Sequence, residues 1–292
     1  MARVRVAATT ANLGVGFDCF GCALSLYAKA SFEECEQGLE IQGCPDEFVN
    51  DENLMVVGYH RVMRELGLSL NGLRIEFSSD IPFERGLGSS AALIVLGIYG
   101  ANANHGYPLT LEQCFQLACE IEGHPDNVAP AIFGGLCISM QDDDGCFVER
   151  VEVHKDLAFT VLIPEFHVST IQARKVLPEK IAHRKAVLTL ARSHMLLKGL
   201  KEADERLIQL SLRDYLHEPY RMKLIEEFDL VKAIGLKHGA IGMCISGSGP
   251  SCLLVSKDFE LSKKIADDLK KLKHKWSCID LKVEENGVKV EG

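Results

Sequence analysis

The sequence lacks the features of membrane-spanning and nucleic-acid-binding proteins. No apolar run approaches the roughly 20 residues that a helix needs to cross a bilayer. Lysine and arginine number 32 against 41 aspartates and glutamates, a formal net charge of −9, whereas nonspecific binding to nucleic acid depends on positive charge. No basic segment followed by an apolar run stands at the N-terminus, so we expect no signal peptide. We therefore expect a cytoplasmic protein without a nucleic-acid or membrane partner.

Metal-binding patterns are also missing. The eleven cysteines are scattered, and the single C-x-x-C pair, Cys19 and Cys22, has no second pair at zinc-site spacing. The acidic run at Asp142, Asp143 and Asp144 lacks the rest of a calcium-binding EF-hand loop, so a solvated turn is the better interpretation. The cysteines are better explained as reduced, mostly buried thiols.

What is present is a mixed set of strand and helix patterns. With 292 residues, of which 47% are hydrophobic, the chain is long enough for two domains. Because strands and helices do not alternate strictly, the pattern indicates an α+β fold with a boundary near residues 155–160. Residues 10–21, rich in small side chains, are predicted to be a loop. The longer predicted helices are 53–66, 110–122, 127–133, 181–200, 201–212, 220–237 and 261–272, and the last predicted strand is 277–284.

A glycine-rich turn follows a strand-like run at 73–77 and precedes an apolar helical run at 91–99. It consists of Pro82, Phe83, Glu84, Arg85, Gly86, Leu87, Gly88, Ser89, Ser90, Ala91 and Ala92. Unpaired N–H groups at a helix N-terminus suit an anion such as phosphate. The turn is neither a Walker A loop, since no lysine follows Gly88, nor a dinucleotide fingerprint, since Ala91 replaces the third glycine. A serine-capped helix without a ligand is the alternative.

Four motifs together resemble a known family. They are the turn at 82–92, the segment 10–18 (Thr-Ala-Asn-Leu-Gly-Val-Gly-Phe-Asp), the segment 124–130 (His-Pro-Asp-Asn-Val-Ala-Pro) and the segment 246–251 (Ser-Gly-Ser-Gly-Pro-Ser). In their order along the chain, these motifs resemble those of the GHMP kinases. The first and third segments along the chain narrow the resemblance to the homoserine kinases.

The resemblance implies two domains with an active site in the cleft between them. Residues 1–157 would form a nucleotide-binding domain like ribosomal protein S5 domain 2, and residues 158–292 a ferredoxin-like domain. The turn at 82–92 would bind ATP. Mg²⁺ would be held by Ser90, or Ser89, together with a helix acid. The candidates for this acid are Glu120 and Glu122. A homodimer is also compatible with the resemblance.

The acceptor implied by the resemblance is L-homoserine, whose side-chain hydroxyl would be phosphorylated. A carboxylate calls for arginine because the guanidinium group binds it in a bidentate manner, and Arg174 and Arg221 match family positions. The other matching substrate contacts are Asn12, Asp18, His124 and Asn127. Catalysis would rely on positioning by Asp18, Asn127 and Arg221 rather than on a general base such as Asp126. Taken singly, each of these residues also fits a turn or a solvated helix face.

Two other functions remain open from the sequence. One is a different GHMP small-molecule kinase, such as a mevalonate or phosphomevalonate kinase, whose acceptor would favour lysines and apolar residues over paired arginines. The other is a non-catalytic binding relative that has kept the fold. The intact turn at 82–92 argues against this second alternative.

Overall fold

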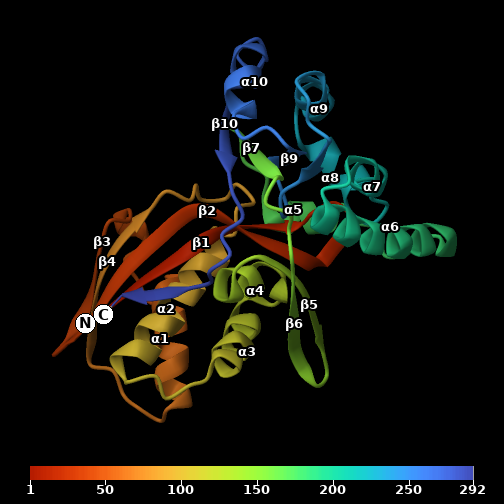
Figure 1. Cartoon of the computed structure of the whole chain (residues 1–292). Coiled ribbons are helices and arrows are strands. Elements are labelled where there is room, and N and C mark those ends of the chain that lie inside the picture. The colour runs from red at the N-terminus through yellow and green to blue at the C-terminus, as the bar shows by residue number, and fades with distance from the viewer. Residues whose placement is uncertain (292) are drawn as a thin grey trace.

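The computed structural model describes residues 1–291, which fold into two β-sheets with associated helices (Figure 1). The first sheet has the strand order β11-β1-β2-β4-β3, with β5 paired to β2 and β6 paired to β5. Most of its pairs are antiparallel, and only β3 and β4 run parallel. Its strands are β1 (Ala2–Asn12), β2 (Gly16–Cys35), β3 (Gly38–Gln42), β4 (Gly72–Ser79), β5 (Leu136–Asp142), β6 (Gly145–Val151) and β11 (Lys289–Glu291).

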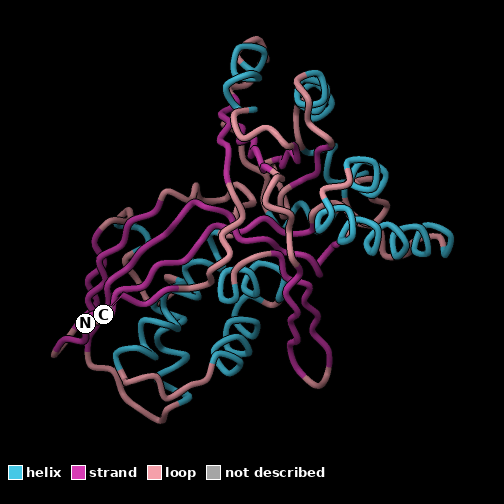
Figure 2. Tube along the Cα trace, viewed as in Figure 1, coloured by secondary structure: helices cyan, strands magenta, loops and turns pink. Residues whose placement is uncertain are grey.

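Helices cover one face of the first sheet, as Figure 2 shows. The central one, α2, has 11 of its 16 residues buried, because it is apolar on all sides and lies between the sheet and α1. Its position matters for function because its first residue follows the glycine turn. The helices of this part are α1 (Leu54–Glu65), α2 (Ser89–Asn104), α3 (Leu111–Glu122) and α4 (Pro125–Phe133), with a short 3₁₀ helix η1 (Asp46–Phe48).

The second sheet is fully antiparallel, with the order β10-β7-β9-β8. Numbered along the chain, this order is 4-1-3-2 in a β-α-β-β-α-β unit, which is the ferredoxin-like topology. The α+β prediction is confirmed. The elements are β7 (Ala158–Pro164), α5 (Thr170–Lys175), α6 (His183–Glu202), α7 (Glu205–Ser211), α8 (Glu218–Arg221), η2 (Met222–Leu224), α9 (Phe228–Lys237), β8 (Gly242–Ile245), β9 (Cys252–Ser256), α10 (Leu261–Leu269) and β10 (Trp276–Leu281).

After β10 the chain returns to the first sheet, where β11 pairs with β1 and brings the two ends of the chain together (Figure 1). The predicted strand 277–284 ends earlier, at Leu281, and β11 was not predicted from the sequence. The division of the chain between residues 157 and 158 stays a prediction. No helix among residues 1–291 has both the length and the apolar character of a membrane span.

The predicted loop at 10–21 is wrong. Strand β1 continues to Asn12 and β2 begins at Gly16, so that only a tight turn separates them. The small residues serve packing instead, because a Cβ atom on Gly21 would lie 1.7 Å from the backbone oxygen of Asp126 in α4. Helix α4 can approach β2 this closely only over a glycine.

The helix boundaries predicted in the second half also need correction. The predicted helix 220–237 is broken into α8, η2 and α9, and Glu227 at the break has a φ of 64°. The Glu227 carboxylate accepts hydrogen bonds from the backbone of Lys273 and His274, a tertiary contact that local sequence does not reveal. The boundary predicted at residue 200 between the helices 181–200 and 201–212 lies a few residues later. Helix α6 ends at Glu202, and Asp204 caps α7.

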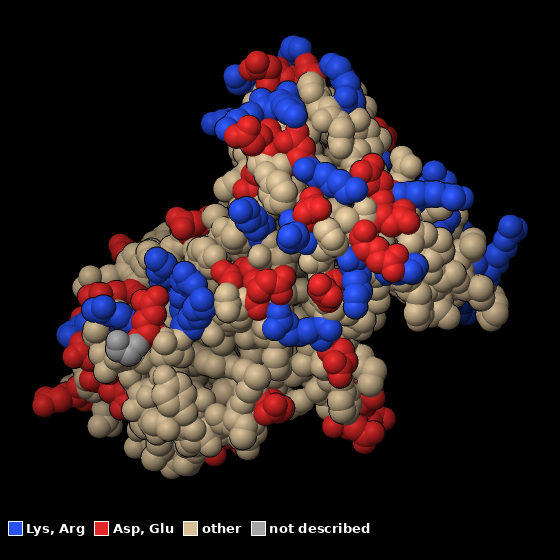
Figure 3. Space-filling model, viewed as in Figure 1, with Lys and Arg blue, Asp and Glu red and all other residues tan. Residues whose placement is uncertain are grey.

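Charged side chains of both signs are interspersed on the face shown in Figure 3. They are densest over the second sheet and its helices, in the upper part of the view. The part of this face over α1 carries fewer charges.

Candidate active site

A cavity of about 430 Å³ lies where the four sequence motifs meet. Twelve of the predicted site residues line it: Asn12, Asp18, Glu84, Gly86, Gly88, Ser89, Ser90, Glu122, His124, Asn127, Arg174 and Arg221. Residues from both halves of the chain therefore contribute to one site. The remaining predicted residues do not line this cavity: Pro82, Phe83, Arg85, Leu87, Ala91, Ala92 and Glu120.

The predicted loop residues outside the cavity support its wall. Leu87, Ala91 and Ala92 are buried in the core. Phe83 packs against Phe77, with ring centroids 6.3 Å apart. Arg85 crosses to the second sheet, where its guanidinium group donates hydrogen bonds to the backbone oxygens of residues 164 and 165. These contacts hold the loop in place while its backbone faces the cavity.

The glycine turn has the conformation expected of an anion-binding loop. Gly88 precedes the first turn of α2 with a φ of 67°, a left-handed conformation that favours glycine. A Cβ atom on Gly88 would lie 1.8 Å from Thr9 Oγ1, so the position is also sterically closed to other residues. No acidic side chain occupies the first turn of α2. The free N–H groups at the start of α2 can therefore bind a phosphate group.

A second glycine turn, residues 246–249, packs directly against the first. The Ser246 hydroxyl donates a 2.6 Å hydrogen bond to the backbone oxygen of Gly86. Gly247 and Ser248 line the cavity. The motif is recognisable in the sequence, but no site residue within it could be predicted, because its position depends on contact with a loop 160 residues away.

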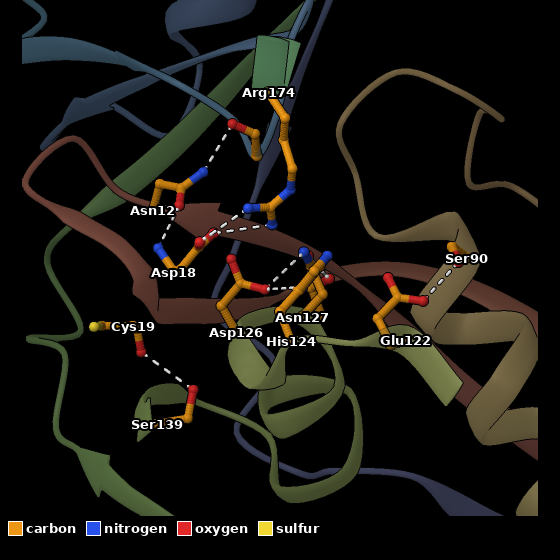
Figure 4. Close-up of polar contacts among 12 residues, drawn as sticks. Asn12, Asp18, Cys19, Ser90, Glu122, His124, Asp126, Asn127, Ser139 and Arg174 are labelled. Carbon is orange, nitrogen blue, oxygen red and sulfur yellow. Dashed lines mark hydrogen bonds and ion pairs between the residues drawn. The ribbon is translucent and has the colours of Figure 1, made fainter. Parts of the chain in front are cut away.

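Only one of the two candidate acids reaches the cavity. Glu122, the last residue of α3, accepts a 2.6 Å hydrogen bond from the Ser90 hydroxyl (Figure 4). Burial raises the pKa of Glu122. Glu120 instead forms a surface ion pair with Arg61 of α1, at 2.9 Å. Residues two positions apart lie on nearly opposite sides of a helix. The pair Ser90 and Glu122 thus offers two oxygen ligands side by side, the donor type that Mg²⁺ prefers.

The start of α4 presents three polar side chains (Figure 4). Asp126 is buried, and its Oδ1 atom accepts hydrogen bonds from His124 Nδ1 at 2.6 Å and Asn127 Nδ2 at 3.4 Å. Asn127 Oδ1 accepts a 2.7 Å bond from the Thr9 hydroxyl. Burial lowers the pKa of His124, but its hydrogen bond to Asp126 and the charge there outweigh this, so the pKa is raised. Asp126 is thus engaged in orienting its two neighbours.

Asn12 and Asp18 flank the tight turn between β1 and β2. Asn12 Nδ2 donates to the backbone oxygen of Gly247 at 2.8 Å, while its Oδ1 accepts from the Asp18 N–H at 2.9 Å. The Asp18 carboxylate accepts a bidentate pair of hydrogen bonds from Arg174, at 3.1 and 3.2 Å (Figure 4). Asp18 and Arg174 form a partly exposed ion pair at the cavity.

Arg221 is only 2% exposed, yet it lines the cavity. Its Nε atom donates to the Ala173 carbonyl and its Nη1 atom to the Gly247 carbonyl, both at 3.1 Å. Within residues 1–291, its Nη2 atom has no hydrogen-bond acceptor. Burial and the nearby Arg174 lower the pKa of Arg221 to about 10, so the guanidinium group stays charged at neutral pH. A buried cation with a free donor at a cavity is suited to an anionic ligand.

One region of the cavity therefore suits a phosphate group, and another suits a small carboxylate. The glycine turn and the Ser90–Glu122 pair form the first, and Arg174 and Arg221 contribute to the second. This division, on two domains of this topology, defines a small-molecule kinase.

Comparison with known families and proteins agrees with this class. The family "GHMP kinases N terminal domain" matches residues 53–135, and "GHMP kinases C terminal" matches residues 196–275. A homoserine kinase from Clostridium botulinum (strain 657 / Type Ba4) is 41% identical, covering 99% of this chain and 98% of its own. One from Caldicellulosiruptor saccharolyticus is 39% identical, covering 99% and 96%.

Solved structures give the same result. The crystal structure of homoserine kinase from Cytophaga hutchinsonii has a TM-score of 0.87 at 30% identity, covering 99% of this chain and 97% of its own. A mevalonate kinase structure has a TM-score of 0.74 at 15% identity, covering 97% and 99%, which shows the shared fold alone. The chain is thus a GHMP kinase. Within that superfamily it belongs to the homoserine kinase family.

Proposed function

We propose that this chain transfers the γ-phosphoryl group of ATP to the side-chain hydroxyl of L-homoserine. The product is O-phospho-L-homoserine, an intermediate of threonine biosynthesis. The observation that carries the proposal is that Arg174 and Arg221 line the same cavity as Gly86 and Gly88. An amino acid whose carboxylate contacts the arginines would then have its hydroxyl within the cavity that receives the triphosphate.

On the donor side, the backbone N–H groups of the glycine turn and of the first turn of α2 would bind the phosphates. Ser90 and Glu122 fit a magnesium ion because their oxygens lie 2.6 Å apart at the cavity. They would hold the ion together with phosphate oxygens and water. When bound, the ion neutralises charge that develops on the phosphoryl group.

On the acceptor side, Arg174 and Arg221 would bind the α-carboxylate. Asp18 would accept a hydrogen bond from the ammonium group or the hydroxyl, and Asn12 holds Asp18 in place through its backbone N–H. His124 and Asn127 complete the wall that faces the acceptor. The Asp18–Arg174 ion pair gives a zwitterionic amino acid an opposite charge at each end.

We infer that chemistry proceeds by positioning and charge stabilisation rather than by a strong general base. The hydroxyl oxygen attacks the γ-phosphorus atom, the bond to the β-phosphate oxygen breaks, and ADP leaves. His124 and Asn127 both donate to the Oδ1 atom of Asp126, so we assign this carboxylate to orienting its two neighbours rather than to accepting the hydroxyl proton. A phosphoryl oxygen is left to receive that proton.

The test is a coupled assay of ADP release with homoserine, mevalonate and galactose as separate acceptors. Activity with homoserine alone supports the proposal. Activity with mevalonate or galactose instead would indicate a different kinase of the same superfamily. If none of the three acceptors gives turnover while ATP still binds, the chain is a binding protein and the proposed reaction is wrong.

We also propose that the protein works in the cytoplasm. All eleven cysteines are free thiols in the described chain, and scattered unpaired thiols fit a reducing compartment. Fractionation of the producing cell tests this location. The homodimer stays a prediction, for which sedimentation of the purified chain is the test.

A further inference from the structure

His217 is a completely buried histidine beside the cavity, and its two ring nitrogens have different partners. Nε2 lies 2.8 Å from the backbone oxygen of Gly14. A carbonyl oxygen can only accept a hydrogen bond, so Nε2 carries the proton. In the neutral ring the Nδ1 lone pair is then free, and it faces Arg221 Nη1 at 3.5 Å. The partners on the two sides thus fix one tautomer of His217.

The neutral state of His217 is favoured by its surroundings. Burial, together with the charge of Arg221, lowers the pKa of His217 to about 4, although nearby Asp214 and Asp18 act in the opposite direction. Protonated Nδ1 would direct an N–H group at the N–H groups of Arg221. A neutral ring instead offers Arg221 an acceptor throughout the neutral pH range.

Phe17 lies next to both side chains. Its ring stacks on His217, with centroids 5.2 Å apart and an interplanar angle of 24°. The guanidinium carbon of Arg221 lies 5.0 Å from the Phe17 ring centroid, and that of Arg174 lies 6.0 Å away. Both distances are within the range of cation–π attraction. One aromatic ring therefore contacts both arginines proposed to bind the acceptor.

The backbone holds His217 at the required place. The Asp214 carboxylate accepts hydrogen bonds from the N–H groups of residues 216, 217 and 218, at 2.8, 2.6 and 2.8 Å. These bonds start α8, which has only four residues and depends on such contacts because a single helical turn is unstable alone. His217 and Arg221 are four positions apart, so they lie on the same side of this turn.

We propose that His217 and Phe17 are positioning residues of the acceptor site. His217 holds the Arg221 guanidinium group through its Nδ1 lone pair. The Phe17 ring contacts the guanidinium groups of both Arg221 and Arg174 and so holds them near each other. Neither residue needs to touch the acceptor. Their shared effect is to keep two like-charged groups close enough to bind one carboxylate, which two free arginines in water would not do. This inference rests on the proposed function, because it assumes that the arginines bind the acceptor's carboxylate.

Two amide substitutions separate the two hydrogen bonds of His217. In His217→Asn the side-chain oxygen takes the place of Nδ1 and keeps an acceptor for Arg221. In His217→Gln the amide reaches the place of Nε2 and keeps a donor to Gly14. If His217 only supported the turn at Gly14 through its Nε2 hydrogen bond, glutamine would be the better replacement. If His217 positions Arg221 through Nδ1, asparagine should be the better replacement, and its variant should bind the acceptor more tightly than the glutamine variant.

The experiment measures kcat and the KM values for homoserine and ATP, with the melting temperature, for wild type and each variant. We expect His217→Gln to raise the homoserine KM about tenfold, the effect of one lost hydrogen bond to a charged group. The KM for ATP should change less than twofold. His217→Asn keeps the acceptor for Arg221, so its KM for homoserine should stay much closer to that of the wild type. His238→Gln, at the far end of α9, is the matched control and should change neither KM.

Phe17→Leu is an independent variant, because Phe17 is only half-buried and its replacement keeps an apolar contact. It should raise the homoserine KM with little effect on the ATP KM. In a double-mutant cycle, His217→Gln should add little to the effect of Arg221→Lys, since both act through one guanidinium group.

The inference is overturned if the wild type uses homoserine while neither His217→Gln nor Phe17→Leu changes its KM. The inference would also be overturned if a variant raised the KM for homoserine and the KM for ATP equally. Such a result would mean that the substitution disturbs the whole fold rather than the acceptor site. If His217 variants fail to fold, the Phe17→Leu result decides. A wild type that does not use homoserine at all points to failure of the proposed function instead, and the same variants are then measured with the acceptor found.

Discussion

Asn12 and Arg221 donate hydrogen bonds to the same backbone oxygen, that of Gly247, at 2.8 and 3.1 Å. Asn12 ends β1 of the first sheet, whereas Arg221 ends α8 in the second half of the chain. Gly247 belongs to the turn that follows β8. One carbonyl group of the second glycine turn thus joins Asn12 and Arg221, which lie on two sides of the proposed acceptor site.

Replacement of Asn12 by alanine should therefore weaken both the fold and the acceptor site. Asn12→Ala removes the bond to Gly247 and the bond from the Asp18 N–H. Leaving buried groups unpaired costs about 1–3 kcal/mol of unfolding free energy. Position 12 has a φ of 71°, a conformation that asparagine tolerates better than alanine. Urea unfolding and the homoserine KM measure the two effects. Exposed Asn286→Ala is the control, and an equal loss of stability there would contradict the prediction.

Comparison of alanine variants at Gly88 and Gly67 separates the effect of a steric clash from that of backbone strain. Gly88 and Gly67 have the same φ of 67°, but a Cβ atom on Gly67 would have no atom within 4 Å, whereas one on Gly88 would meet Thr9. Gly67→Ala should lose only the strain of the left-handed conformation, about 1–2 kcal/mol of stability, and keep the ATP KM. Gly88→Ala should lose more stability and raise the ATP KM at least about tenfold, because the loop must move. Similar ATP KM values in both variants would show that the loop does not bind the phosphates.

The glycine turn at 82–92 could be predicted from the sequence because its signal is local, whereas the two arginines were predicted from the resemblance of their motifs to a known family. The sequence left the choice between Glu120 and Glu122 open for a physical reason. The two residues lie on nearly opposite sides of α3, so one faces the cavity and the other faces α1, and only the packing of α3 decides which. The roles proposed for Phe17 and His217 could not be predicted from the sequence for a similar reason. They depend on contacts between segments about 200 residues apart.

Glu122 and Glu120 provide a matched pair for the proposed magnesium site. Glu122→Gln should lower kcat about a hundredfold, the scale of losing one group that stabilises a charged transition state, and should raise the Mg²⁺ concentration needed for half-maximal rate. Glu120→Gln should remain within about twofold of wild type, because a surface ion pair contributes under about 1 kcal/mol. A magnesium titration of ATP turnover for both variants gives the comparison. A larger defect in Glu120→Gln would assign the metal to the other acid.

Asp126 and Arg221 distinguish positioning from general-base catalysis. Asp126→Ala frees His124 and Asn127 but leaves in place the arginines proposed to bind the carboxylate, so we expect a loss of about tenfold in kcat. Arg221→Ala removes a buried charge from the acceptor site and should lower kcat/KM for homoserine at least about a hundredfold. Steady-state kinetics with saturating ATP measure both. The no-base mechanism fails if Asp126→Ala abolishes turnover while homoserine still binds with wild-type affinity.

Glu218 should make stability depend on pH. It is buried at the start of α8, where its Oε1 atom accepts a 2.7 Å hydrogen bond from the Ile245 N–H. Burial raises its pKa from an ordinary value of 4.5 to about 8. The folded state therefore retains a proton that the unfolded chain releases above about pH 4.5. Its contribution to stability is complete below that pH, declines as the pH rises, and is lost once the pH passes about 8.

Glu218→Gln cannot titrate, and it keeps an oxygen acceptor for the Ile245 N–H. Relative to wild type, its unfolding free energy should therefore rise between pH 5 and pH 8, by a few kcal/mol at the scale of about 1.4 kcal/mol per pKa unit. Urea unfolding at pH 5, 6.5 and 8 measures this difference. Exposed Glu226 is the control, because hydrogen bonds from Lys273 and His274 lower its pKa. Its contribution to stability is therefore already complete above about pH 4.5, so Glu226→Gln should differ from wild type by the same small amount at all three pH values. Parallel pH curves for Glu218→Gln and wild type would mean that Glu218 is ionised in the folded protein.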